Sequence, residues 1–450
     1  MSSFCSVGKA AWGILTLALL AGLALAAPAG AAWSAPKYLN SAFIPAELPA
    51  EIATDTDEFY FVFADSSGMV KMKKYSGTGA SLGGATLTPR PTNPEQELSA
   101  EMPNLGVNAV GDSAYAWLTS NNAGTRSIIQ ARTRTASGQL GPVRTLLDIG
   151  QAEGEVELPE VAVDADGDAV IAWTQISVTG AETGQVKART LSKTGVLGPV
   201  KTISQDSRGA LAEFVQVGMR PAGDAVFAWQ FGTNAIEGQI QTRTLTSAGV
   251  LSKTRNVSRL ESTTPDFSMA PDGDALFTWV YADPFAGGLN VQARTMSATG
   301  ELGRTLNISP RGGEALEQHG AYNSNGVAAF AYTLKDPIVG KTALYARTMS
   351  ATGTLSKARE LAGPSASGDV TFPDVGISNS GRAVFSWLKP TAAGERLESN
   401  TMTSAGVLGT KRTVVSGQLF ENRMAVAPTG PAATSWVDQE FKRVGAAFGP

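Results

Sequence analysis

The chain has 450 residues, of which 17% are charged, and its formal net charge is −4. The only cysteine is Cys5 and the only histidine is His319, which excludes a disulfide framework and an ordinary zinc site. No basic block or stripe is present, so nucleic acid is not expected as a partner.

The first predicted element is a secretory signal peptide over residues 1–32. Lys9 precedes an uncharged, apolar run from Ala10 to Ala27, and small residues then lead to Trp33. We therefore expect a secreted or cell-surface protein whose mature chain, residues 33–450, is a single domain. An uncleaved membrane anchor is the alternative, because the apolar run is nearly long enough to span a bilayer.

One unit recurs eight times after this segment. Each copy contains an aromatic residue that closes a short apolar run: Phe63, Trp117, Trp173, Trp229, Trp279, Tyr332, Trp387 and Trp436. Neighbouring copies are 49 to 56 residues apart, which is a spacing typical of propeller blades.

The third copy shows the expected elements of one unit. Strands are predicted at residues 159–164, 169–173, 185–191 and 197–204. Tight turns containing Gly167 and Gly195 separate the first pair and the last pair, since glycine tolerates positive φ. Four strands joined in sequence form one up-and-down antiparallel sheet.

The two ends of the chain predict how the ring closes. The last unit ends after a third strand, at residues 444–448, so it lacks its fourth. Residues 33–41 read like a fourth strand and lead directly into the first unit. The sequence thus predicts an all-β, eight-bladed β-propeller of four-stranded blades, closed by an N-terminal strand that completes the last blade. Seven blades with an unpaired remnant are the alternative.

The units resemble secreted bacterial β-propeller repeats with the pattern GDAVxAW…QARTxSxxGxLG. The pattern is seen in GDAVIAW, which ends at Trp173, and in QARTMSATGELG, which begins at Gln292. The resemblance covers essentially the whole mature chain. It implies the propeller fold and an extracytoplasmic setting, and it implies no activity.

Residues that repeat in every unit are expected to serve the fold. The recurrent tryptophans are expected to pack between blades. Five arginines recur on the third strands, and we expect them to pair with acids on the second strands. The arginines are Arg132, Arg189, Arg243, Arg294 and Arg347, and the acids are Asp112, Asp168, Asp224 and Asp274.

A position that varies between units is the better candidate for a binding site. Eleven residues before the aromatic, the side chains are small, as expected where blades converge. Thirteen residues before it, they are polar and differ from unit to unit: Asn104, Glu160, Gln216, Asp266, His319, Asp374 and Arg423, with Ala50 in the first unit. If the first strand is innermost, these residues surround one mouth of the ring and could bind a sugar or a cation. A solvated polar rim without a ligand is the other interpretation.

The sequence predicts an extracytoplasmic binding module with a glycan or a cell-surface protein as its partner. The alternatives are a carbohydrate-active hydrolase or lyase that uses paired carboxylates, and a protein-binding scaffold. No cofactor is expected, with calcium as the alternative at Asp164, Asp166 and Asp168, although these residues fit a hairpin turn better. The G-x-S-x-G match at residues 79–83 lies in a turn between strands, which does not suit a serine hydrolase.

Overall fold

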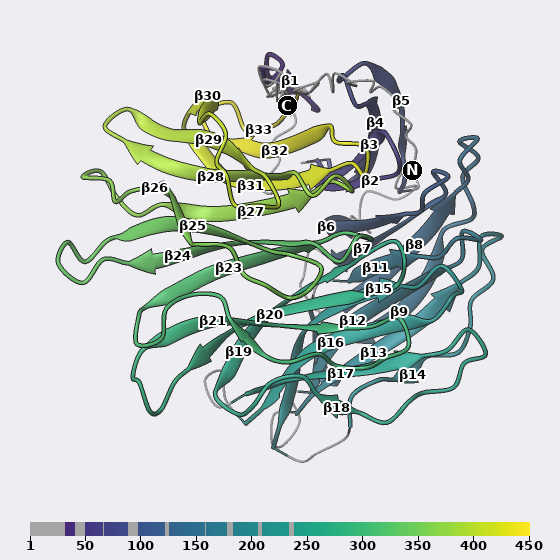
Figure 1. Cartoon of the computed structure of the whole chain (residues 1–450). Helices are drawn as coiled ribbons and strands as arrows, with labels where there is room; N and C mark the ends of the chain where they lie inside the picture. The colour runs from purple at the N-terminus through teal and green to yellow at the C-terminus, as the bar shows by residue number, and fades with distance from the viewer. Residues whose placement is uncertain are drawn as a thin grey trace, which may run out of the picture.

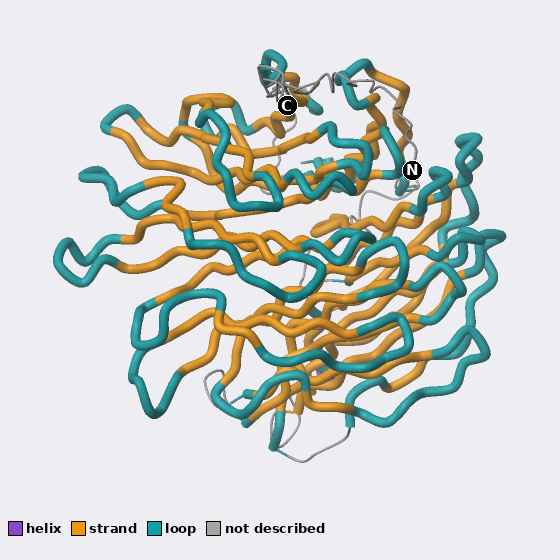
Figure 2. The backbone as a smooth tube through the Cα atoms, viewed as in Figure 1, coloured by secondary structure: helices purple, strands orange, loops and turns teal. Residues whose placement is uncertain are grey.

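The computed structural model describes residues 32–40, 50–65, 67–88, 98–121, 126–157, 159–177, 183–205, 209–233 and 238–450. The predicted signal peptide, residues 1–32, lies outside this part except for Ala32. The described residues form eight antiparallel sheets, arranged around a common axis in the order of the sequence (Figure 1). Loops at both ends of the sheets join the strands (Figure 2). None of the described segments is a helix long and apolar enough to cross a bilayer.

The first half of the ring contains blades 1 to 4. Blade 1 consists of β2 (Glu51–Thr54), β3 (Glu58–Ala64), β4 (Val70–Ser76) and β5 (Ser81–Thr86), and blade 2 of β6 (Leu98–Val107), β7 (Ser113–Asn121), β8 (Arg126–Arg134) and β9 (Arg144–Gly150). Blade 3 consists of β10 (Glu155–Val156), β11 (Glu160–Val163), β12 (Ala169–Ser177), β13 (Thr183–Leu191) and β14 (Lys201–Thr202). Blade 4 consists of β15 (Leu211–Met219), β16 (Ala225–Gly232), β17 (Gln239–Leu245) and β18 (Arg255–Asn256). A short 3-10 helix, η2 (Gln151–Glu153), precedes β10. In blade 3, β10 and β11 both pair with β12.

The second half contains blades 5 to 8. Blade 5 consists of β19 (Ser262–Met269), β20 (Ala275–Ala282), β21 (Leu289–Met296) and β22 (Leu306–Asn307), and blade 6 of β23 (Ala315–Tyr322), β24 (Ala328–Lys335), β25 (Thr342–Met349) and β26 (Arg359–Ala362). Blade 7 consists of β27 (Thr371–Ile377), β28 (Ala383–Thr391), β29 (Gly394–Met402) and β30 (Arg412–Gly417). Blade 8 consists of β31 (Leu419–Val426), β32 (Ala432–Asp438), β33 (Arg443–Gly449) and β1 (Lys37–Tyr38).

The innermost strands show that the ring is closed and has eight blades. The first strand of each blade contacts the first strand of the next blade, and β31 of the last blade contacts β2 of the first. The start and the end of the chain therefore meet at one place, as the colours in Figure 1 show. The prediction of eight blades is confirmed, and the alternative of seven blades is wrong.

The N-terminal strand completes the last blade, as predicted. Lys37 pairs with Ala446 and Tyr38 pairs with Gly445. The backbone N–H of Leu39 donates to the Val444 carbonyl at 2.8 Å, and the Leu39 side chain is buried among residues of blades 8 and 1. Because this strand covers the edge of β33, the last blade has no open edge there.

The recurrent aromatics are packing residues. All eight side chains are at most 1% exposed. Trp173 of blade 3, for example, packs in one cluster with Ala116 and Ala131 of blade 2. Each aromatic thus removes a large apolar surface from water, and burial of this kind is the main contribution to the stability of the ring.

Small residues allow the innermost strands to approach each other. A Cβ atom added to Gly376 would lie 2.5 Å from Cγ2 of Val426, on the next blade. A Cβ atom added to Gly218 would lie 2.8 Å from Cε1 of Phe267. These distances are shorter than real carbon contacts, so the predicted position of small side chains at the convergence of the blades is confirmed.

The third-strand arginines do not pair with the second-strand acids, and that expectation is wrong. Arg243 donates from Nε to the Ser252 carbonyl of its own blade at 2.7 Å and from Nη1 to the Ile203 carbonyl of the preceding blade at 2.8 Å. The same bridge recurs at Arg132, Arg189, Arg294 and Arg347. The planar guanidinium has donors in two directions, so one side chain satisfies main-chain carbonyls of two blades.

The second-strand acids hold the turn between the third and fourth strands. Asp224 Oδ1 accepts the N–H of Ser247 at 3.0 Å, and Asp274 Oδ1 accepts the N–H of Ala298 at 2.6 Å. Asp112 and Asp168 do the same for Ala136 and Lys193. The arginines and the acids therefore have separate structural roles.

We expect Arg243→Met to lower the free energy of unfolding by about 2 kcal/mol, because it leaves two carbonyls without their charged donor. Arg243→Lys should recover only part of this loss, since one ammonium group cannot donate to both carbonyls as the planar guanidinium does. Urea denaturation measures the free energy of unfolding of both variants, and Lys253→Met, at an exposed residue, is the control. Equal stability of Arg243→Met and the unaltered protein would contradict the bridge.

Candidate functional site

The seven predicted site residues lie at one level of the ring. Each pairs with the residue that precedes the recurrent aromatic of its blade, as Glu160 does with Ala172 and Asp374 with Ser386. This register holds for Asn104, Glu160, Gln216, Asp266, His319, Asp374 and Arg423. Glu160 begins its strand, whereas the other six residues lie further along theirs, as Asp266 does in β19. We call the part of the molecule from the start of the innermost strands down to the level of these residues the mouth.

Glu51, rather than Ala50, occupies this position in blade 1. Glu51 pairs with Val62, the residue before Phe63, whereas Ala50 is fully buried and its carbonyl accepts a hydrogen bond from Ser435. The first hairpin of blade 1 has four residues between the pair Thr54 and Phe59, one fewer than in the second blade. Counting back from the aromatic therefore missed the position by one residue. With Glu51, all eight blades contribute a polar residue, and we call these eight the ring residues.

A β-bulge precedes the ring residue in six blades. The residue two positions before it adopts a left-handed conformation, with φ between 45° and 54°, although none is glycine: Met102, Phe214, Thr264, Glu317, Phe372 and Glu421. Such residues cost about 1–2 kcal/mol each and are found most often next to functional sites. The bulges also change the direction of the neighbouring side chains, so that these residues flank the ring residues at the mouth.

Arg423 is the cation of the ring. Its Nε donates to Glu51 Oε1 at 3.0 Å, and its Nη2 lies 3.9 Å from Glu421 Oε2. The Glu51 carboxylate, with smaller contributions from Asp374 and Glu421, holds the pKa of Arg423 above its usual range despite partial burial. Blades 8 and 1 are thus joined at the mouth by an ion pair.

Glu160 is a ring acid whose pKa lies well above its usual range. Burial, and next the negative charge of Glu51, raises the pKa of Glu160 to about 8, while a hydrogen bond with Asn104 and the charge of Arg423 act in the opposite direction. Glu160 therefore carries its proton at neutral pH. An acid whose pKa is raised in this way can serve as a proton donor in general acid–base catalysis.

Two other ring acids connect neighbouring blades. Asp266 Oδ2 accepts the backbone N–H of Gly320 at 2.8 Å, and Asp374 Oδ2 accepts that of Met424 at 2.8 Å. Each N–H lies on the innermost strand of the next blade. Burial raises the pKa of Asp374, and the charges of His319 and Arg423 lower it. These carboxylates therefore contribute to the fold as well as to the polarity of the mouth.

A pocket of about 610 Å³ opens at the mouth between blades 5 and 6. Three ring residues line it, namely Gln216, Asp266 and His319, and His319 Nδ1 lies 3.8 Å from Asp266 Oδ1. The left-handed residues Thr264 and Glu317 belong to the same wall. The rest of the lining is largely apolar: Pro265, Val280, Ala282, Leu289 and Leu316. The volume and this mixture of surfaces are typical of small-ligand sites.

The sequence did not reveal Glu261 and Glu317 as residues of this pocket. The sequence does contain one signal for Glu317, because an acid, Glu421, also stands two residues before the ring residue Arg423 in blade 8. Nothing in the repeat pattern indicates the left-handed backbone conformations of Glu261 and Glu317. Among the described residues, no group of three or more His, Cys, Asp or Glu is arranged to hold a metal ion.

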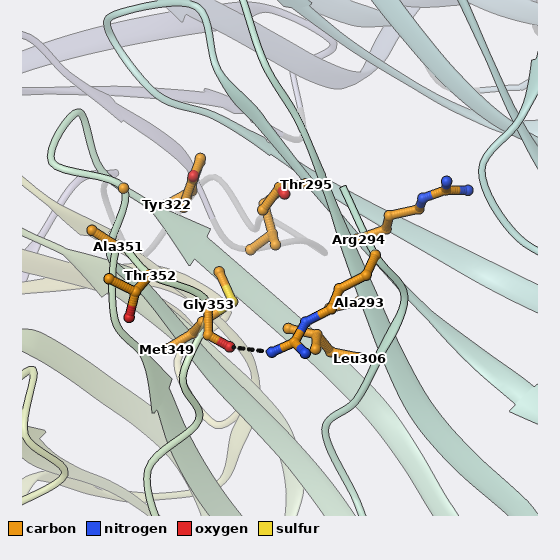
Figure 3. Close-up of a pocket in the computed structure, with 12 residues that line it drawn as sticks. Ala293, Arg294, Thr295, Leu306, Tyr322, Met349, Ala351, Thr352 and Gly353 are labelled. Carbon is orange, nitrogen blue, oxygen red and sulfur yellow. Dashed lines mark hydrogen bonds between the residues drawn. The ribbon is translucent and has the colours of Figure 1, made fainter. Parts of the chain in front are cut away.

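A smaller pocket of about 220 Å³ lies between blades 5 and 6 near the turns at the opposite end of the strands. Arg304 lines this pocket, and its Nη2 donates to the Gly353 carbonyl at 3.3 Å. Figure 3 shows that the guanidinium of Arg294 points away from the other labelled residues. No ring residue reaches this pocket. It is a packing gap between two blades that main-chain turns border.

No family model matches the chain, and no curated protein matches it. Solved structures that resemble it include the polysaccharide lyase Uly1 (9% identity, 81% of this chain and 89% of that chain, TM-score 0.45) and the β-propeller domain of the Trilobed protease from Pyrococcus furiosus (9%, 82% and 97%, 0.44). The α-L-arabinofuranosidase of Fusarium graminearum in complex with arabinobiose is a third (12%, 66% and 94%, 0.38). At such values the likeness gives no information about the ligand of this chain.

Proposed function

We propose that this protein is an extracytoplasmic binding module that recognises a carbohydrate at the mouth of the propeller. The observation that carries the proposal is the pocket of about 610 Å³, which brings ring residues from three blades against an apolar wall. A sugar presents hydroxyl groups at its rim and C–H groups on its faces, so it matches a site that combines amide, carboxylate and imidazole groups with aliphatic side chains.

The variability of the ring residues supports the same proposal. A position that served only the fold would be expected to repeat one kind of residue in most units, as the buried aromatics and the arginines do. The ring position instead carries acids, amides, an imidazole and a guanidinium. This variety gives the mouth an asymmetric pattern of donors and acceptors, and such a pattern is what recognition of one ligand requires.

Binding by residues 33–450 to a glycan panel, followed by calorimetry on the best sugar, tests the proposal. We expect Gln216→Ala and His319→Ala each to weaken binding about tenfold, which corresponds to about 1.4 kcal/mol, with unchanged thermal stability. Gln139→Ala, at an exposed turn, is the matched control. A panel without any bound sugar, or binding that both variants leave intact, would contradict the proposed site.

A second candidate function is cleavage of a saccharide at the ring residues of blades 1 and 3, outside the pocket. The observation that favours it is the difference between two carboxyl groups, since Glu160 is protonated at neutral pH while Glu51 forms an ion pair with Arg423. Glu160 would act as the acid and an ionised carboxylate as the base or nucleophile. Release of new reducing ends by the unaltered protein, abolished in Glu160→Gln with binding retained, would support it. Binding without turnover would leave the module a binding protein only.

A further inference from the structure

The charges around the mouth pocket narrow the class of ligand. Three acids line the pocket, Glu261, Asp266 and Glu317, and its lining includes neither lysine nor arginine. His319 is the one basic group in the lining. A cavity with this lining has a negative potential, which favours a cation and repels an anion.

The acids are not neutralised by the protein itself. Within the described residues, neither Glu261 nor Glu317 forms an ion pair with a lysine or an arginine. Arg423, the ring cation, is engaged with Glu51 and Glu421 instead. Carboxylates that line one cavity without a lysine or arginine repel one another, and a cationic ligand would relieve that repulsion.

The backbone presents these two acids to the pocket. Glu261, directly before β19, has φ of 66°, and Glu317, in β23, has φ of 45°, so both side chains are carried by left-handed backbone positions. The carboxylate of Glu317 accepts the Phe372 N–H, and burial raises its pKa. A protonated amine close to Glu317 would stabilise the ionised form and increase the attraction.

The arrangement suits an organic cation better than a metal ion. The described acids and His319 do not converge into a group that could hold a metal, because they are spread around a cavity of about 610 Å³. The apolar wall, which includes Val280 and Leu289, needs a ligand that also has C–H surface. An amino sugar combines both requirements in one molecule.

We infer that the mouth pocket selects amino sugars with free, protonated amines and rejects acidic glycans. This inference rests on the proposed carbohydrate-binding function and adds its specificity. Phe285, at 88% exposed, lies on the loop between the pocket residues Ala282 and Leu289, where a longer oligosaccharide would continue past the pocket.

Calorimetry with three oligosaccharides tests the inference. The probes are glucosamine hexamer, its N-acetylated form and an oligogalacturonate, at about pH 6 and low salt. We expect the glucosamine hexamer to bind at least about tenfold more tightly than the N-acetylated form, and the oligogalacturonate not to bind. Raising the salt concentration should weaken only the glucosamine complex, because screening reduces the attraction between charges.

Two variants connect this preference with the pocket. Glu261→Gln and Glu317→Gln should each reduce the preference for the amine about tenfold, while Glu301→Gln, at an exposed turn on the opposite end, should leave it unchanged. Equal affinity for the cationic hexamer and its neutral N-acetylated form would overturn the inference and leave the proposed function standing. Binding of none of the saccharides, on this set or on the wider panel, would overturn both.

Discussion

Removal of residues 33–40 is expected to open the ring and to cause the largest loss of stability of any short deletion. These residues contribute strand β1, the buried side chain of Leu39, and Trp33, whose Nε1 donates to Ser399 Oγ at 2.6 Å. The single substitution Leu39→Ala should lower the free energy of unfolding by about 3 kcal/mol, since a buried leucine is replaced by a cavity. The deletion should cost more, because it also removes the backbone hydrogen bonds to β33.

Urea denaturation and size-exclusion chromatography measure this effect. The control is the chain from residue 33 to 450, which lacks only the predicted signal peptide. We also expect the deleted form to associate, since the unpaired edge of β33 would be exposed. A deletion that unfolds at the same urea concentration as the control would mean that β1 does not close the ring.

Glu160→Gln is expected to stabilise the protein at alkaline pH and to leave it almost unchanged at pH 4. The pKa of Glu160 is about 8 in the folded protein, against about 4.3 in an unfolded chain. Between these values the unfolded chain has lost a proton that the folded chain retains, so stability falls as the pH rises through this window. Glutamine has no proton to lose, and we expect a gain of about 2 kcal/mol at pH 8.5.

The measurement is the free energy of unfolding of both proteins at several pH values between 4 and 9. Glu301→Gln, an exposed acid at the tip of a turn, serves as the control and should show no such dependence. If the free energies of unfolding of Glu160→Gln and the unaltered protein differed by the same amount at pH 4 and at pH 8.5, the pKa of Glu160 would not be raised in the folded protein. Carbohydrate binding measured over the same range would show whether the protonated form of Glu160 also serves the ligand.

The candidate site shows how far strand periodicity carries a prediction. Seven of the eight ring residues follow from counting back from the aromatic, because the alternation of a strand is strict over short distances. The eighth, Glu51, was missed because one hairpin is a residue shorter. The acids Glu261 and Glu317 were missed for a different reason, since their positions depend on left-handed backbone conformations, in Glu317 at a bulge and in Glu261 directly before β19.

The sequence by itself determined the eight units, the buried aromatics and the closure of the ring. These features are local or can be counted, since each unit contains its own strands and turns, and the last unit visibly lacks one strand. Only the tertiary structure decided what the arginines bind and where the pocket lies. Arg243 reaches a main-chain carbonyl of another blade, and a carbonyl acceptor has no signature in the sequence. The pocket is lined by bulge residues of two neighbouring blades, Thr264 and Glu317, and their proximity depends on the packing of one blade against the next.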